Sequence, residues 1–211
     1  MTFSTFLRPA ALLAVALTLA SCGGKATFPV TGTVSGLLYD GLVLSTNGMD
    51  VAVPAKATSF SFPNTVSYGE VYNVVQKTPP QHQSCVTVDP TTGRETGTDT
   101  AGRLQSVSII VTCATNAYTI GGTISVVNKD GTAGTLADSE LQLTNGSTGG
   151  TVVAAAGATT FTFSNPVAYN VSYGVTVLAA PSNAVCTVAN GTGVMGDAAI
   201  TNISVTCQRN S

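Results

Sequence analysis

The sequence contains no tryptophan, a single histidine and few charged residues, and each shortage removes a class of protein. Charged residues make up 9% of the chain, so Thr, Ser, Asn and Gly must cover the surface. That composition is common in extracellular β domains and unsuited to a cytosolic helical enzyme. No basic patch with interleaved aromatics is present, which argues against a nucleic-acid partner. A Ser-His-Asp triad would have to use His82, and no G-x-S-x-G nucleophile elbow accompanies it.

Metal-binding and phosphate-binding motifs are also lacking. The cysteines are widely spaced without a CxxC pair, which makes a poor zinc ligand set. Glycine pairs such as Gly149-Gly150 lack the strand-to-helix context of a phosphate loop. Calcium is the one cofactor left open, because two short runs carry oxygen ligands: Asp89, Glu95 and Asp99, and Asn128 and Asp130. Neither run has the regular spacing of a calcium loop, so we expect turn-forming roles, no cofactor and no metal.

The N-terminal segment, residues 1–21, has the anatomy of a secretory signal peptide. Arg8 precedes an apolar stretch from Ala10 to Ala20, and small residues follow. A transmembrane anchor is the alternative, but spanning the hydrocarbon core takes about 20 strongly apolar residues. The sequence therefore predicts a signal helix that is removed on export.

The string Leu19-Ala20-Ser21-Cys22 resembles the lipobox of bacterial lipoproteins. This resemblance implies cleavage before Cys22, a diacylglycerol on its thiol and an acyl chain such as palmitate on its amine. Residues 22–27 would then be a lipidated tether, and the membrane a partner through this lipid. The resemblance also implies the outer membrane, because Gly23 replaces the aspartate that favours inner-membrane retention. The alternative, a plain secreted protein, leaves a reactive unpaired thiol at the mature N-terminus.

The chain after residue 21 is a duplicated sequence. Residues 59–85 align with residues 160–186 without a gap at a constant offset of 101. Nine positions are identical in this window, including Phe60/Phe161, Tyr72/Tyr173 and Cys85/Cys186. A repeat of this length predicts two domains, residues 28–113 and 118–207.

The matching residues alternate, as they do in strands with one buried face. Turn sequences such as Asn47-Gly48 and Asn145-Gly146 bound them. The fold class we predict is all-β: two tandem seven-stranded immunoglobulin-like β-sandwich domains after an N-terminal signal helix. The pattern G-T-V…L-x-L…F-x-F…Y-x-V…C resembles repeats of bacterial surface and envelope proteins, and is loosely similar to prealbumin-like sandwiches that serve as stalks or spacers. The tryptophan of true immunoglobulin domains is absent.

The remaining four cysteines fall as one pair at the end of each repeat. Because both repeats preserve both positions, we expect disulfides Cys85–Cys113 and Cys186–Cys207. Closing loops of 27 and 20 intervening residues stabilises each domain by roughly 3–4 kcal/mol in the chain-entropy model.

The two repeats differ in an excursion, residues 89–103, that only the first contains. It holds five charged residues, Asp89, Arg94, Glu95, Asp99 and Arg103, and loops on a rigid sandwich often bind partners. This loop is the candidate contact surface; a solvated hairpin tip that grew by insertion is the simpler alternative.

Histidine and tyrosine are the other residues that invite a functional role. His82 has Asn183 as its repeat counterpart, so we interpret it as an exposed loop residue. Tyr68/Tyr169 and Tyr72/Tyr173 are preserved between the repeats, which favours packing with hydroxyls that reach a polar rim.

These patterns favour a non-enzymatic bacterial envelope lipoprotein that acts as a structural spacer or interaction module. An unknown envelope protein or glycan would be its partner. The alternatives are a carbohydrate- or peptidoglycan-binding surface protein that uses sandwich loops, and a hydrolase with a site near Ala114–Ala117. The linker at 114–117 is short, so we expect the domains to sit end to end with restricted motion.

Overall fold

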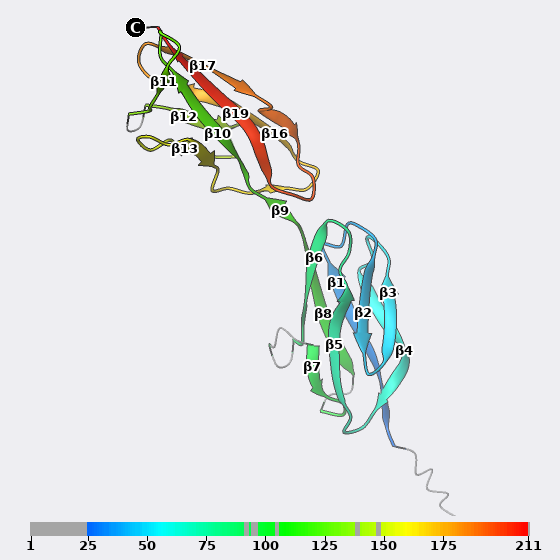
Figure 1. Ribbon diagram of the computed structural model, residues 1–211. Helices are drawn as coiled ribbons and strands as arrows, with labels where there is room; N and C mark the ends of the chain where they lie inside the picture. The colour runs from blue at the N-terminus through cyan, green and yellow to red at the C-terminus, as the bar shows by residue number, and fades with distance from the viewer. Residues whose placement is uncertain are drawn as a thin grey trace, which may run out of the picture.

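The structure, a computed structural model, describes residues 25–90, 93, 97–103, 106–137, 140–146 and 149–210. The expected signal helix and Cys22 lie outside these residues. The described chain forms β-strands and no helix, as the all-β prediction requires. In this part of the chain, accordingly, no helix is long and apolar enough to cross a membrane. Figure 1 shows two sandwich-like halves joined end to end, with the first strand entering at one end and the C-terminus at the other.

The first half is a sandwich of two four-stranded sheets. Its strands are β1 (Thr27–Ser35), β2 (Leu42–Thr46), β3 (Met49–Val53), β4 (Ser59–Ser67), β5 (Val71–Thr78), β6 (Gln83–Val88), β7 (Gly97–Thr100) and β8 (Val107–Thr115). The sheets have the orders β4-β1-β8-β6 and β3-β2-β5-β7. Alternate residues of each strand point between the sheets, where Val30, Leu44, Phe62, Val74 and Ile109 form part of a buried core.

The second half repeats this arrangement, with several strands shorter than their counterparts in the first half. They are β9 (Ala117–Tyr118), β10 (Ile120–Val127), β11 (Ala133–Gly134), β12 (Gln142–Asn145), β13 (Thr151–Val153), β14 (Thr160–Thr162), β15 (Val167–Ala168), β16 (Ser172–Ala179), β17 (Ala184–Ala189), β18 (Thr192–Val194) and β19 (Ile200–Arg209). One sheet has the order β11-β10-β19-β17, and β14 also pairs with β10. The other sheet has the order β13-β12-β16-β18. The duplicated sequence therefore encodes a duplicated topology, with a separate core in each half.

Gly32 and Gly122 occupy equivalent positions in the two repeats, and the strand pairing explains why both are glycine. In each half the first long strand pairs in parallel with the last one, β1 with β8 and β10 with β19. A Cβ atom on Gly32 would come within 2.3 Å of the Ile109 carbonyl oxygen, and one on Gly122 within 1.9 Å of the Ile203 carbonyl oxygen. Real Cβ atoms never approach so closely, so this strand pairing requires glycine at both positions.

Two features of the predicted fold class are corrected. The described first half contains eight strands rather than seven, because residues 97–100 form β7 on the edge of β5. The strand order is also not that of an immunoglobulin domain, in which the first two strands share a sheet. Here β1 and β2 lie in opposite sheets.

Both expected disulfides are present, Cys85–Cys113 and Cys186–Cys207. The cysteines of each pair are direct register partners on neighbouring antiparallel strands, β6 with β8 and β17 with β19. Each disulfide therefore links an edge strand, β6 or β17, to its neighbour in the same sheet, β8 or β19. In antibody domains the disulfide instead joins the two sheets.

Candidate functional sites

The charged excursion after β6 is only partly a surface loop. Asp89 is 1% exposed and accepts a hydrogen bond of 3.0 Å from the Tyr72 hydroxyl, so its assignment to an exposed contact loop is wrong. Asp99 lies on β7, opposite Tyr72, and its side chain is 9% exposed. Arg103 donates to Asp99 Oδ1 at 3.1 Å and is 61% exposed. Arg94 and Glu95 lie outside the described residues.

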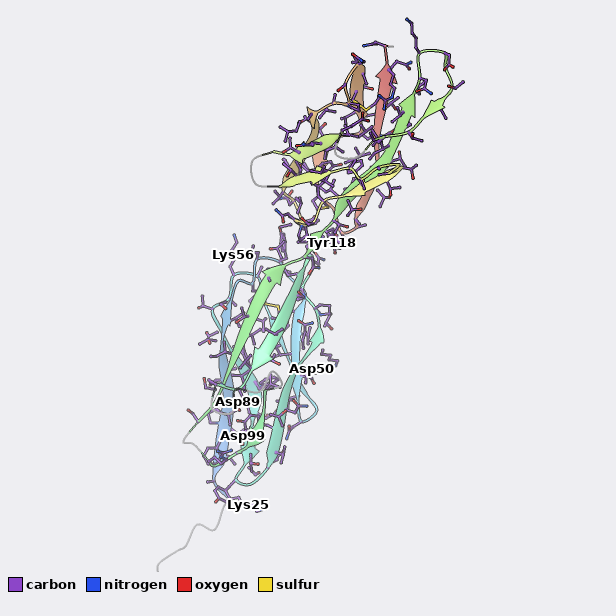
Figure 2. The ribbon with its side chains drawn as sticks, turned by 90° about the vertical axis from the view of Figure 1, so that its left-hand side faces the viewer. Lys25, Asp50, Lys56, Asp89, Asp99 and Tyr118 are labelled. Carbon is purple, nitrogen blue, oxygen red and sulfur yellow. A yellow bond between two sulfur atoms is a disulfide. The ribbon has the colours of Figure 1, made fainter. Side chains whose placement is uncertain are left out.

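In this part of the first half, Tyr72 and Asp89 are buried and bound to each other. Burial, followed by the hydrogen bond to Asp89 and the Asp89 and Asp99 charges, raises the pKa of Tyr72 above its usual range. The phenol therefore stays a neutral donor to the Asp89 carboxylate. The cavity beside it, lined by Asp99, Arg103 and Ser106 among others, holds about 150 Å³. Ordinary ligand pockets hold roughly 300–1,000 Å³. Figure 2 shows Asp89 and Asp99 away from the junction, on the side of Lys25.

The junction brings together four side chains from the two halves. The His82 ring lies parallel to the Tyr169 ring, with centroids 3.7 Å apart and an interplanar angle of 4°. Its Nδ1 lies 2.7 Å from Asp197 Oδ2 and 2.9 Å from Asp197 Oδ1. Tyr39 packs edge-on against both rings, at 5.2 Å from His82 and 5.8 Å from Tyr169. We call Tyr39, His82, Tyr169 and Asp197 the junction cluster.

The backbone at the junction supports this cluster. The His82 carbonyl accepts the Asn116 N–H at 2.9 Å, and the Asn116 carbonyl accepts the Tyr169 N–H at 2.8 Å. The single residue between β8 and β9 is thus hydrogen-bonded to a turn of each half. Tyr118, on β9, lies between the two halves in Figure 2.

His82 occupies the turn between β5 and β6 with φ of 57°, and its repeat counterpart Asn183 has φ of 58°. This left-handed conformation is common for Asn and unusual for other side chains. The interpretation of His82 as an exposed loop residue is wrong: its side chain is 23% exposed and bound to the other half. The repeat alignment could not reveal this role, because Asp197 has a sequence separation of 115 from His82 and lies outside the aligned window.

The junction cluster is a set of side-chain contacts between the two halves. Its members are two phenols, one imidazole and one carboxylate. Among the described residues, no group of three His, Cys, Asp or Glu side chains is placed to hold a metal ion. The arrangement can fix an angle between the two halves, because a stacked ring pair and a hydrogen bond to a carboxylate are both sensitive to orientation.

The two pairs of repeated tyrosines have different environments. Tyr72 is 5% exposed with its hydroxyl on buried Asp89, so the expectation of a hydroxyl at a polar rim is wrong for this residue. Tyr169 is in the junction cluster. Tyr68 is 62% exposed and packs over Gly102, where a Cβ atom would lie 2.3 Å from its ring. A glycan platform needs exposed rings, and Tyr68 is the exposed member of these four.

No protein-family model matches the sequence, and no curated protein is similar to it in sequence. Several solved structures, including the following three, are loosely similar to the chain. The Bacillus anthracis TIE protein has a TM-score of 0.47 and 13% identity, over 87% of this chain and 34% of that one. A C-terminal fragment of the pilus adhesin SpaC from Lactobacillus rhamnosus GG has a TM-score of 0.38 and 10% identity, over 88% of this chain and 98% of that one. The major pilin protein of Streptococcus pyogenes has a TM-score of 0.29 and 10% identity, over 88% of this chain and 98% of that one. The chain thus spans about a third of the TIE protein, and no function is carried across from scores this low.

Proposed function

We propose that this protein is a non-enzymatic bacterial envelope lipoprotein whose two sandwich domains, residues 28–113 and 118–207, form a spacer or interaction module. The observation that carries the proposal is the junction cluster, in which His82 binds both Tyr169 and Asp197. A flexible linker would leave the two halves free to fold back on one another. The cluster and the two hydrogen bonds of Asn116 instead hold them end to end.

The anchor belongs to the same proposal. A signal peptide at 1–21 directs export, lipid on Cys22 attaches the chain to the outer membrane, and residues 22–27 are the tether. The end-to-end arrangement supports this geometry, because Lys25 and the C-terminus lie at opposite ends of the described chain (Figures 1 and 2). A lipid at one end therefore holds the other end at the greatest distance from the bilayer.

Partner contact would take place at that distal end. The turn at Lys129-Asp130-Gly131, between β10 and β11, is exposed there, and the Asp130 side chain fastens it through Thr132. An envelope protein or a glycan is the class of partner we propose, with no role for nucleic acid. The mechanism is positional: the chain presents a rigid tip and performs no chemistry.

The test of the anchor is Cys22→Ser in the native organism, with membrane and soluble fractions compared by immunoblotting. We expect the wild-type protein in the membrane fraction and the variant in the soluble one. The matched control is Ser21→Ala, which retains a small residue before the cysteine and should leave the protein in the membrane. Mass spectrometry of the N-terminal peptide should find acyl chains on Cys22. A Cys22→Ser protein that still sediments with membranes would contradict lipidation.

A further inference from the structure

The outer edge of β17 lacks the protection that other sheet edges of this protein have. An exposed edge strand is a template for pairing, and proteins guard such edges with charge, proline, irregular register or short length. Asp50 lies on edge strand β3 and Asp99 on β7, while β4 carries Pro63 and an irregular register with β1. The edge strands β13, β14 and β18 have three residues each. Strand β17 has six uncharged residues, no proline and a regular register with β19.

The equivalent edge in the first half, β6, is partly closed by a side chain. Directly opposed cysteines 4.0 Å apart at Cα form the close, non-hydrogen-bonded kind of antiparallel pair, so their N–H groups point away from the partner strand. The Cys85 N–H consequently faces the edge, where Gln76 Oε1 accepts it at 3.2 Å. The residue equivalent to Gln76 in the second half is Val177, which has no acceptor. Within the described residues, no hydrogen bond reaches the outward N–H groups of Cys186 and Val188.

An open groove runs beside this edge. It lies between β16 and β17, has a volume of about 660 Å³, and is lined by Val175, Val177, Cys186 and Val188 together with Thr176, Asn190, Gly191 and Thr192. None of these residues is charged. A charged side chain that entered the groove would be buried without an ion pair, so the groove favours an uncharged, extended partner strand.

We propose that β17 is a self-association surface, on which β17 of a second copy pairs antiparallel to extend the sheet of β10, β19 and β17 across the dimer. A two-fold axis at Cys186 lets the outward N–H and C=O groups of Cys186 bond reciprocally with those of the partner copy. The Val188 N–H then donates to the Ala184 carbonyl of the partner copy, while the Ala184 N–H keeps its hydrogen bond to the Pro181 carbonyl. This register also matches the side chains, since Ala184 opposes Val188 on the groove side and Val185 opposes Thr187 on the outer side.

Charge supports a second copy as the occupant. A two-fold pair brings identical strands together, and charged edges would repel one another. Strand β17 carries no charge, and the nearest cation on its neighbour β19, Arg209, donates to Glu140 Oε2 and the Thr135 carbonyl at 3.1 Å each. Val185, 59% exposed, adds apolar area that pairing would cover. The proposal is independent of the lipid anchor.

The test is sedimentation velocity of the purified full-length protein in density-matched detergent micelles, over a range of concentrations. Thr187→Lys places a charge on the edge without touching the core. Val177→Gln supplies the internal acceptor that Gln76 provides in the first half. We expect each substitution to raise the dimer dissociation constant by at least about tenfold. Val86→Lys, at the position on β6 equivalent to Thr187, should leave it unchanged.

Hydrogen exchange gives a second readout. The amides of Cys186 and Val188, which face away from β19, should be protected in the wild-type dimer and should exchange faster in Thr187→Lys, whose unchanged circular dichroism would show that the fold is retained. A wild-type protein that stays monomeric at ~100 µM, far above the micromolar range of specific association, would overturn the proposal. Equal dissociation constants in all four proteins, or a loss in Val86→Lys as large as in Thr187→Lys, would overturn it as well.

Discussion

His82 of the first sandwich lies flat against Tyr169 of the second, with ring centroids 3.7 Å apart, and its Nδ1 lies 2.7 Å from Asp197 Oδ2. One side chain of the β5–β6 turn is therefore held by two residues of the other half. The half-exposed hydrogen bond between His82 and Asp197 contributes roughly 0.5–1.5 kcal/mol, and the stacked rings contribute about the same. Such energies select an orientation between two folded units without being needed to fold either.

Replacing His82 tests that selection. His82→Asn keeps a residue suited to positive φ, since Asn183 occupies the equivalent turn, but removes the stacked ring and its contact with the Asp197 carboxylate. We expect small-angle X-ray scattering to show a broader distribution of interdomain orientations, with the melting temperature of each sandwich within a few degrees of wild type. Asn183→His is the matched control and should leave the scattering curve unchanged. Unaltered scattering of His82→Asn would show that the Asn116 hydrogen bonds suffice.

The disulfides should stabilise the two halves separately. Cys85→Ser should destabilise the first sandwich by roughly 3–4 kcal/mol, because the reduced chain regains the entropy of the open loop. Cys186→Ser should do the same to the second. Differential scanning calorimetry should show one displaced transition in each variant, since the two cores are separate clusters. A single variant that displaced both transitions equally would contradict independent domains.

Gln83 is a buried polar residue whose loss should be costly. It is 2% exposed, its Oε1 accepts the Leu38 and Tyr39 N–H groups at 2.7 and 3.1 Å, and its Nε2 donates to the Gly36 carbonyl at 2.7 Å. Gln83→Ala leaves these backbone groups without a partner, at a cost of about 1–3 kcal/mol for each that stays buried.

Chemical denaturation should therefore report a lower unfolding free energy for the first sandwich. Its repeat counterpart is already alanine, Ala184, so Ala184→Gly serves as the control of side-chain loss in the second half. A Gln83→Ala protein as stable as wild type would mean that water replaces the amide.

Alkaline pH should weaken the first sandwich through Tyr72. Its pKa is raised in the folded state, so the phenol keeps its proton where an unfolded tyrosine, with a pKa of about 10, loses it. The stabilisation is complete below pH about 10 and is lost as pH rises through the folded pKa. Urea unfolding at a series of pH values should show this decline, and Tyr72→Phe should remove it. An equal alkaline decline in Tyr72→Phe would assign the effect to another group.

The duplication and the disulfides could be predicted from the sequence because they depend on alternation and on paired cysteines, both of which are local or repeated signals. Gly32 and Gly122 were visible as a repeated residue, but the reason for them was not. They are needed because the first and last strands run side by side in parallel, a contact between residues far apart in sequence.

Other features could not be predicted because their partners are distant. The sequence predicts that Asp89 is a loop carboxylate, but it is buried and accepts a hydrogen bond from the Tyr72 hydroxyl on β5, a strand of the opposite sheet. The sequence predicts that Asp99 is part of a loop tip, but main-chain pairing with β5 places it in strand β7. The repeat counterpart of His82 is Asn183 rather than a second histidine, so the repeat gives no sign of the junction contacts that His82 makes.

The most direct test of a lipid-tethered spacer is neutron reflectometry of the acylated full-length protein on a supported bilayer. Two sandwiches end to end, with strands of nine and ten residues at their centres, should give a protein layer about 60 Å thick. His82→Asn should give a thinner or more diffuse layer under the same conditions. A wild-type layer only about 30 Å thick, the length of one such strand, would show that the chain lies flat or folds back and would contradict the account.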